Sequence, residues 1–565
     1  MEQNLDFSFL REECIGIDAF FETPFGERLL VYCDYTASGR CLRFIERYLM
    51  DIQRTYANTH TEDDVSGRSM TQLLHQAEQK IKDAVNAGPE GRIIAIGAGS
   101  TAAIDKCQQI LGVQLPPATR CLLSNLLGRH PLVPEGRSPV VFVGPYEHHS
   151  NEVTWRQGIA EVHEVRLSED GGIDLEHLEE LLQRPENEGR RLIGSFSAAS
   201  NVTGRISPVH EIAALLHRYG AIACFDYAAS SPYVKIDMCP PPLPGSQDPG
   251  EDRSLDAIFL SPHKLLGGPG SAGILVFKKG LYDCELDPTV GGGGTVSYVG
   301  PLDHDFIPDI EQREKAGTPG VLQTMKAALA YEVKERIGIE RLEEREQELL
   351  RRAFDVWQKN PNIEILGNPD PSKRIAIVSF NLKDPRGGYL HPRLVTVLLN
   401  DLFGIQSRAG CSCAGPYGHR LLNIPLDLAE RYRRQVLLGY EAIKPGWCRV
   451  GFHYIMDDLE ADYVIQAVDF LARRGWLFVS EYRLDLKTGT WTHKSGHEHL
   501  EEFSLEAALS SGPLIHEPLS QAKRARIYSR FLEEADRLAL SLEPFAPASP
   551  QKLRGELGEL QFFSM

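Results

Sequence analysis

One lysine of this chain lies where a reactive amine is useful. Lys264 follows the apolar run Leu255 to Leu260 and precedes a glycine-rich turn, with Ser261 and His263 beside it. A lysine at the end of a buried strand is costly to desolvate unless it has a partner or takes part in chemistry. One such chemistry is a Schiff base to pyridoxal phosphate (PLP), with Ser261 and His263 close to the phosphate. The alternative is a solvated surface lysine, as most lysines are.

A glycine-rich junction carries two hydroxyl groups. Ser100 and Thr101 follow Gly97-Ala98-Gly99, between a predicted strand over residues 92–97 and a predicted helix over residues 100–111. Glycines let the backbone approach a ligand closely, and a helix N-terminus offers free amides and a favourable dipole. The junction therefore suits a phosphate. The same hydroxyls also fit an ordinary helix cap.

His148 comes directly after the predicted strand over residues 139–144, within the segment Glu147-His148-His149-Ser150-Asn151. Its ring is suited to lie flat on a flavin or pyridine ring. A metal site would need a third ligand at a suitable spacing, which the sequence does not offer. A hydrogen-bonded structural histidine is the alternative.

Asn201 and Asp226 follow two further strands, predicted over residues 192–196 and 221–225. Asn201 is suited to hydrogen-bond a phenolic oxygen or a carboxylate, or to stabilise a turn. A carboxylate as deep as Asp226 needs a cation or several donors. A protonated pyridine nitrogen is such a cation, and this pairing makes PLP an effective electron sink. Helix capping is the alternative for Asp226.

The elements that must position these groups indicate the fold class. From about residue 90 to 280, continuous Val, Ile and Phe runs alternate with amphipathic segments. This pattern predicts an α/β fold with a mostly parallel sheet buried on both faces. Ligands of such sheets bind at the carboxyl ends of the strands. Each candidate residue of this region lies just after a strand.

A second domain follows. A long helical stretch over about residues 324–360 leads to strands and helices between residues 374 and 473, which indicate a smaller α+β domain. The region 476–493 resembles a hairpin, and a mixed helical tail comes after it. The predicted division is an N-terminal segment contributing to the small domain (1–54), a large PLP-binding domain (55–325), the small domain (326–475) and a C-terminal extension with a hairpin and helices (476–565).

The composition excludes several classes of protein. The chain has 565 residues and a formal net charge of −18, which argues against a nucleic-acid surface. No apolar stretch reaches membrane-spanning length, and residues 1–13 lack the apolar run of a signal peptide. The 11 cysteines are therefore expected to be reduced thiols. We expect a cytoplasmic protein that binds neither nucleic acid nor membrane.

Taken in order, these segments resemble one family. The chain is similar to the class V branch of the fold-type I PLP-dependent enzymes (the class V aminotransferase superfamily), and within it to the cysteine desulfurases and selenocysteine lyases. The resemblance runs from about Tyr32 to Ala472. The segments that carry it are Gly99-Ser100-Thr101, Glu147 to Asn151, Ser200-Asn201-Val202-Thr203-Gly204, Asp226, Ser261-Pro262-His263-Lys264, Gly317-Thr318-Pro319 and Arg408 to Ala414.

The resemblance implies a fold with a seven-stranded sheet and a role for each matching residue. Lys264 would form the Schiff base, His148 would stack on the pyridine ring and shuttle protons, Asp226 would pair with the ring nitrogen, and Asn201 would reach the phenolic oxygen. The phosphate would be held by Ser100, Thr101, Ser261 and His263. Thr318 would contact the phosphate of a neighbouring subunit, which implies a homodimer.

One departure from the family pattern lies beside the cofactor-binding aspartate. Many relatives carry a glutamine three residues after the aspartate, where this chain has Ala229. The change removes a hydrogen bond to the cofactor oxygen. Either a neighbouring group replaces it, or the reaction differs from the usual one.

A cysteine pair distinguishes a desulfurase from other PLP enzymes. In the resembling families the cysteine at the position of Cys413 attacks the substrate sulfur as a thiolate, which a nearby cation such as Arg408 favours. The loop around Cys411 and Cys413 and the segment Gly291 to Thr295 are also similar to those of molybdenum-cofactor sulfurases. Alternatively, the two cysteines are a metal or redox pair, or packing residues in an enzyme that uses no thiol.

Two arginines complete the expected site. By the resemblance, Arg449 clamps the carboxylate of the substrate, and a bidentate guanidinium–carboxylate pair suits that task. Arg408 is the second expected substrate-binding residue. A structural ion pair is the alternative for Arg449.

We therefore expect a PLP-dependent lyase or sulfurtransferase of the cysteine desulfurase type. It would remove sulfur from L-cysteine, or selenium from selenocysteine, to give alanine and an enzyme persulfide. The freed Lys264 would take the Cα proton, and Cys413 would attack the sulfur. A sulfur-acceptor protein is an expected partner, and no metal is expected. The alternatives are a C–S lyase, an epimerase or another class V enzyme that uses no cysteine nucleophile, a molybdenum-cofactor sulfurase, and a non-catalytic binding module of the same fold.

Overall fold

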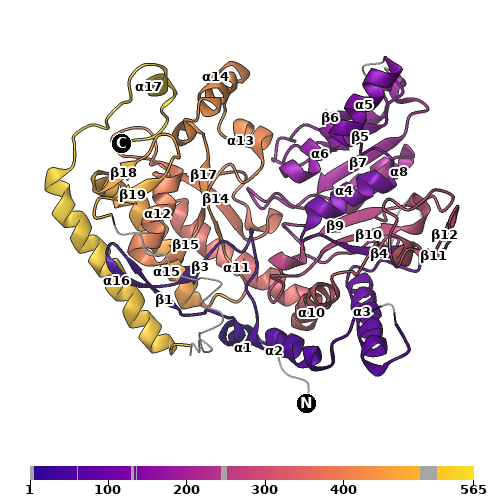
Figure 1. Cartoon of the computed structure of the whole chain (residues 1–565). Helices are drawn as coiled ribbons and strands as arrows, with labels where there is room; N and C mark the ends of the chain where they lie inside the picture. Colours follow the sequence, from indigo (N-terminus) through magenta and orange to yellow (C-terminus); the bar gives the residue numbers. More distant parts are fainter. Residues whose placement is uncertain (1–4, 60, 129–132, 135, 243–250, 497–517) are drawn as a thin grey trace. The chain divides into compact units, whose positions relative to one another are not determined.

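The computed structural model describes residues 5–59, 61–128, 133–134, 136–242, 251–496 and 518–565 (Figure 1). Two compact units make up the chain. Unit 2 comprises residues 36–201 and 205–343, and unit 1 comprises residues 1–35, 202–204 and 344–565. Across the described ranges, no helix is both long enough and apolar enough to cross a membrane.

Unit 2 is built on a seven-stranded sheet of order β4-β10-β9-β8-β7-β5-β6. Only β10 runs antiparallel to its neighbours; the other pairs are parallel. The prediction of an α/β fold with a mostly parallel seven-stranded sheet is confirmed. The strands are β4 (Gly91–Ile96), β5 (Val140–Val143), β6 (Glu161–Glu164), β7 (Leu192–Ser197), β8 (Ile222–Asp226), β9 (Ala257–Leu260) and β10 (Gly273–Lys278).

Helices cover both faces of this sheet (Figure 1). Ala103 and Cys107 of α4 pack in one core cluster with Ile193 of β7. Gly194, the next residue along β7, faces the opposite way, and a Cβ added there would lie 2.4 Å from Leu216 of α8. The helices of the unit are α2 (Arg43–Ile52), α3 (Val65–Ala84), α4 (Ser100–Ile110), α5 (Pro117–Leu127), α6 (Val153–Gln157), α7 (Leu175–Leu182), α8 (Val209–Arg218), α9 (Ile310–Arg313) and α10 (Val321–Ile337).

The long helical stretch expected over residues 324–360 is two helices, α10 and α11 (Ile339–Trp357). Gly338 separates them with a φ of +88°. This conformation lies outside the right-handed helical region and is readily adopted only by glycine. A single glycine is tolerated within a helix, so Gly338 alone does not predict the break.

Unit 1 contains a four-stranded antiparallel sheet of order β13-β14-β17-β16. β3 (Val31–Tyr32), near the N-terminus, pairs in parallel with β15 (Ile405–Gln406), and β1 (Phe20–Thr23) forms a hairpin with β2 (Gly26–Leu29). The sheet strands are β13 (Ile363–Ile365), β14 (Ile377–Leu382), β16 (Arg408–Gly410) and β17 (Trp447–Gly451). The helices α12 (Pro392–Phe403), α13 (Gly415–Leu421), α14 (Leu426–Leu437) and α15 (Asp458–Arg474) belong to the same unit.

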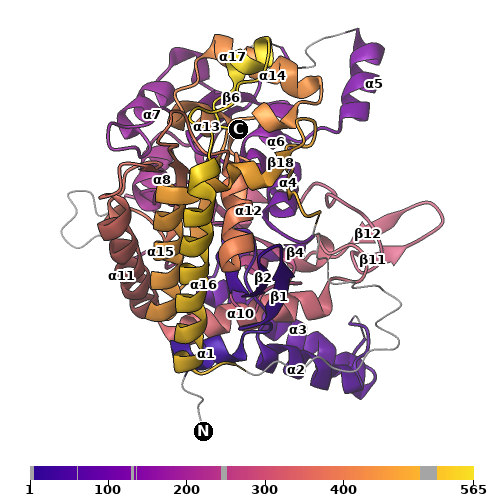
Figure 2. The same cartoon turned by 90° about the vertical axis from the view of Figure 1, so that its left-hand side faces the viewer.

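The C-terminal residues pack on unit 1. β18 (Tyr482–Leu484) and β19 (Trp491–His493) form an antiparallel hairpin. Helix α16 (Gln521–Leu542) lies along α12 and α15 (Figure 2), and its Tyr528 stacks on Tyr463 of α15 with ring centroids 4.1 Å apart. Residues 497–517, between the hairpin and α16, lie outside the described residues.

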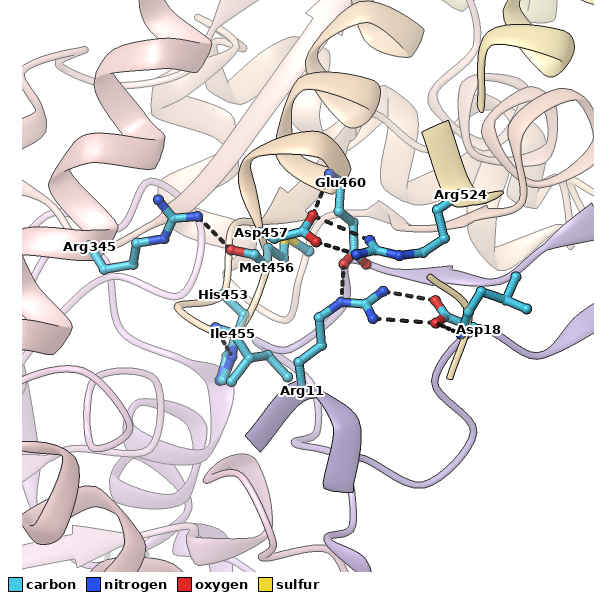
Figure 3. A network of polar contacts seen from close by, with 10 residues as sticks. Arg11, Asp18, Arg345, His453, Ile455, Met456, Asp457, Glu460 and Arg524 are labelled. Atoms are coloured by element: carbon cyan, nitrogen blue, oxygen red, sulfur yellow. Dashed lines mark hydrogen bonds and ion pairs between the residues drawn. The ribbon is translucent and has the colours of Figure 1, made fainter. Parts of the chain in front are cut away.

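Ion pairs join α16 and the N-terminal helix α1 (Phe7–Glu13) to the start of α15 (Figure 3). Arg11 of α1 donates to both oxygens of Asp18 and to Glu460 of α15. Arg524 of α16 pairs with Asp457, the residue that caps α15. Segments from the two ends of the chain therefore meet at one helix N-terminus.

Candidate active site

The polar residues predicted to bind a cofactor follow neighbouring strands of unit 2. His148 follows β5, Asn201 follows β7, Asp226 ends β8 and Lys264 follows β9. These four strands are adjacent and parallel. Their carboxyl ends therefore meet at one edge of the sheet, which is where ligands of parallel sheets bind.

The N-terminus of α4 forms a small cradle at this edge. The backbone N–H of Ser100 donates to Oγ of Ser261 at 2.9 Å. Gly99 has no side chain, and a Cβ added there would lie 3.0 Å from Cε1 of His263 and 3.3 Å from Oγ of Ser261. Nδ1 of His263 is buried and has no hydrogen-bond partner within the described ranges. Hydroxyls, helix amides and an imidazole nitrogen thus border one space, and together they suit a phosphate.

Ser150 fixes the ring of His148. The backbone N–H of Ser150 donates to Nδ1 of His148 at 3.1 Å, so this nitrogen is an acceptor and a neutral ring carries its proton on Nε2. The Ser150 hydroxyl lies 3.1 Å from the same nitrogen and 2.7 Å from Oγ1 of Thr101. The contact joins Thr101, which follows β4, to the residues that follow β5.

Asp226 is a buried carboxylate beside the lysine. It accepts a hydrogen bond of 2.9 Å from the backbone N–H of Ala228. Burial raises the pKa of Asp226, while Ala228, the positive charge of Lys264 and a hydrogen bond from Ser100 act in the opposite direction. A carboxylate in this environment is stabilised further by a cation. Lys264 itself is half-buried, at the end of the short turn Pro262–Lys264.

Two other predicted residues of this unit differ in exposure. Asn201 is buried at the end of the segment that follows β7. Thr318 is exposed, and its Oγ1 accepts a 3.1 Å hydrogen bond from Nδ2 of Asn58. Ala229 is buried in the turn after β8.

Glu147, the residue before His148, is a residue of this region that sequence reasoning missed, and it forms a buried hydrogen-bond network. It accepts hydrogen bonds from the backbone N–H and the hydroxyl of Ser197, at 2.8 and 2.6 Å, and from Nδ2 of Asn151 at 2.7 Å. Burial raises the pKa of Glu147 to about 7. Two sequence signals mark it: its position next to His148, shortly after an apolar strand, and its place in the family-like segment Glu147 to Asn151.

The residues of unit 2 fit PLP. The α4 cradle matches a phosphate, Asp226 matches a protonated ring nitrogen, and Lys264 provides an amine. The unpartnered nitrogen of His263 and the space that a Gly99 side chain would fill are the observations that support this match.

Unit 1 brings the two predicted arginines together. Strands β16 and β17 pair so that Arg408 lies directly opposite Arg449. Asp34 contacts both: its Oδ2 is 2.8 Å from Nε of Arg408, and its Oδ1 is 3.1 Å from Nη2 of Arg449. Sequence reasoning missed Asp34, although it lies at the start of the family resemblance, two residues after Tyr32.

The loop of Cys413 is short and lies between β16 and α13. Ser412 and Cys413 have φ values of +51° and +55°, which are uncommon for residues other than glycine. The indole N–H of Trp447 donates to Oγ of Ser412 at 3.1 Å and stabilises the turn. Cys413 is exposed and Cys411 is half-buried. Cys413 is also near enough for its negative charge, when ionised, to act on the pKa of Arg449.

Comparisons with known proteins identify relatives of this chain in sequence and in fold. Residues 31–464 match the aminotransferase class-V family. A "probable cysteine desulfurase" of Halalkalibacterium halodurans is 30% identical over 392 residues, which cover 68% of this chain and 84% of that protein. In structure, the chain is similar to an apo cysteine desulfurase of Thermococcus onnurineus NA1 (TM-score 0.60, 20% identity, 79% of this chain and 95% of that chain). It is also similar to an Escherichia coli cysteine desulfurase (TM-score 0.58, 21% identity, 78% and 93%).

Proposed function

This chain belongs to the aminotransferase class-V family, whose members are PLP-dependent, and we propose that it removes sulfur from L-cysteine, or selenium from selenocysteine. The observation that carries the proposal is the exposed thiol of Cys413 on a loop next to the strand of Arg408. A thiol there is needed for desulfuration and has no task in a lyase that uses no nucleophile. Relatives named cysteine desulfurase support the same reaction.

Each residue has a task in this reaction. Ser100, Thr101, Ser261 and His263 would hold the phosphate of PLP, and Asn201 would bind its phenolic oxygen. Asp226 would keep a proton on the ring nitrogen, and His148 would stack on the ring and shuttle protons. Bound PLP supplies an electron sink for the substrate Cα. Nζ of Lys264 takes the Cα proton, and Arg449, with Arg408 beside it, binds the substrate carboxylate.

The sulfur transfer balances without an added oxidant or reductant. The Cys413 thiolate attacks the substrate sulfur, a new S–S bond forms, and the Cβ–S bond breaks. The electron pair of the broken bond remains on Cβ, which takes up a proton. L-Cysteine and the thiol thus become L-alanine and a persulfide on Cys413, from which an acceptor protein takes the sulfur.

Product analysis tests the proposal. Purified holoprotein is incubated with L-cysteine, and alanine, sulfide, pyruvate and ammonia are quantified in the presence of a reducing thiol. We expect alanine and sulfide in equal amounts, and a loss of at least about a hundredfold in Cys413→Ser, because a hydroxyl is a far weaker nucleophile toward sulfur. Cys121→Ser, which changes an exposed cysteine of α5, is the matched control and should keep full activity.

Two results would count against desulfuration. Pyruvate and ammonia from both the parent protein and Cys413→Ser would identify a β-eliminating lyase. Full alanine production by Cys413→Ser would show that the thiol has no role in the reaction.

Thr318 is proposed to contact the phosphate bound by a second subunit, which makes a homodimer the expected assembly. Its exposure on the loop after α9 is compatible with such a contact. The family resemblance of the segment Gly317-Thr318-Pro319 is the support for this assignment.

A further inference from the structure

Asp34 lies between two arginines that face each other across paired strands. Arg408 and Arg449 are directly opposite in the β16–β17 pair. Like charges in opposite positions of a sheet repel each other. Asp34 places one carboxylate oxygen on each guanidinium, at 2.8 Å from Arg408 and 3.1 Å from Arg449. One carboxylate is therefore shared by both cations.

The backbone holds Asp34 in this place. The N–H of Cys33, the preceding residue, donates to the carbonyl of Gln406 at 2.9 Å, and the carbonyl of Cys33 accepts from the N–H of Gly451 at 2.7 Å. Cys33 is thus tied to the segments that carry both arginines. Asp34 follows with little freedom, and it is only 9% exposed.

Burial makes the counter-ion important for Arg449. This residue is 4% exposed, whereas 54% of the Arg408 side chain is accessible to solvent. Burial lowers the pKa of Arg449, the carboxylate of Asp34 raises it, and the charge of Arg408 lowers it. Arg408, Arg449 and Asp34 together carry one net positive charge, which complements the carboxylate of an amino acid.

We propose that Asp34 is a positioning residue that holds Arg449 in the orientation in which it binds the carboxylate of an amino acid substrate. The inference rests on the proposed function in one respect, the assignment of Arg449 as the carboxylate clamp. An asparagine at position 34 keeps the shape, but it offers one acceptor oxygen and one donor group. Only one arginine then keeps its contact, and the two guanidinium groups lose their shared counter-ion.

The test compares two ligands that differ by a carboxylate. L-Alanine and ethylamine are titrated into wild-type and Asp34→Asn holoenzyme, and the absorbance of the bound PLP is followed. We expect the Kd of L-alanine to rise about tenfold, and the Kd of ethylamine to change by less than about twofold. With L-cysteine, KM should rise by a similar factor while kcat stays within about threefold. A purely structural role would not separate these quantities.

A matched control uses another buried carboxylate of the same unit. Asp384→Asn removes the partner of Arg386, 2.7 Å away, and should change neither Kd. If Asp34→Asn yields too little folded protein, Asp34→Glu is tested in its place. The displaced carboxylate should raise the Kd of L-alanine about threefold and leave the Kd of ethylamine unchanged.

Equal changes for both ligands, no change, or tighter binding of L-alanine would each overturn the inference. Failure of the wild-type enzyme to produce alanine and sulfide from L-cysteine would overturn the proposed function instead. The comparison of L-alanine with ethylamine does not depend on that reaction.

Discussion

Gly99 shows how one backbone position limits what binds at the N-terminus of α4. Its φ is 180°, an extended conformation that any residue adopts. A glycine is therefore favoured here by its small size and not by its backbone flexibility. The space that a side chain would take is bordered by His263 and Ser261. A methyl group there would compete with a bound phosphate.

Gly99→Ala is therefore expected to weaken PLP binding. The added Cβ would lie 3.0 Å from Cε1 of His263, closer than an ordinary van der Waals contact. We expect the Kd of PLP for the apoprotein to rise at least about tenfold, equivalent to about 1.4 kcal/mol. Fluorescence titration of the apoprotein with PLP measures it. Gly280→Ala is the control, since among the described residues, its two chain neighbours aside, none has an atom within 4 Å of the added Cβ. Equal Kd values in the two variants would contradict the phosphate site.

Which site residues can be predicted from sequence depends on where their partners lie. Ser100, His148, Asp226 and Lys264 follow strands, and the geometry of a parallel sheet brings such positions together whatever the loops do. No such rule predicts the contacts of Asp34. Its partners are 374 and 415 residues away, and the contacts depend on the pairing of β3 with β15.

At the scale of elements, continuous apolar runs in the sequence predict the buried strands, but they do not predict every strand of the sheet. β5, β7 and β9 are continuous apolar or small-residue runs, and the sequence predicts them. β6, with the sequence Glu-Val-His-Glu, lies at the sheet edge, where polar residues are tolerated and no buried-strand pattern arises. The sequence analysis does not predict β10, although it is apolar. It follows β9 with no α-helix between them, as an antiparallel strand can, so it does not fit the alternation of strands and helices.

Helix α16 offers a prediction at this scale. Arg524 is 4% exposed and pairs with Asp457, the cap of α15. Arg524→Met would leave the carboxylate of Asp457, which is 30% exposed, without its guanidinium partner. The loss of a hydrogen bond to a charged group costs about 1.5 kcal/mol or more. We expect a lower free energy of unfolding in urea and faster hydrogen exchange in α16 and in the first turn of α15.

Arg526→Met is the control for this change, because Arg526 is exposed two residues further along the same helix. Its free energy of unfolding should stay within about 0.5 kcal/mol of the parent value. Unaltered exchange in α16 of Arg524→Met would show that the ion pair does not fasten the helix. PLP absorbance should be the same in both variants, because neither residue belongs to the proposed cofactor site of unit 2.

Over the whole molecule, the formal net charge of −18 does not show which groups govern the response to acid. Two histidines of unit 1 are buried in their neutral form. Burial lowers the pKa of His391 to about 4 and that of His453 to about 3. His391 also caps α12, where its Nδ1 accepts the N–H of Arg393 at 3.1 Å and its Nε2 donates to the carbonyl of Ala442 at 2.9 Å. Protonation would remove the acceptor.

The sign of the pH dependence follows from these values. The unfolded chain binds a proton at His391 below about pH 6.5, and the folded chain does so only below about pH 4. Between these two values the unfolded state holds more protons, so stability falls as the pH falls through this window. The loss from His391 alone is about 3 kcal/mol.

His391→Asn isolates this contribution, since asparagine keeps an acceptor for the cap of α12 but does not titrate. We expect the wild type to lose about 3 kcal/mol more than the variant between pH 7 and pH 4, measured as the free energy of unfolding in urea at each pH. The carboxylates that also titrate there are the same in both proteins, so they cancel in the difference. His304→Asn, which changes an exposed residue of β12 (His304–Phe306), should follow the wild-type curve. Parallel curves for wild type and His391→Asn would mean that the folded state accepts the proton at His391 as readily as the unfolded chain does.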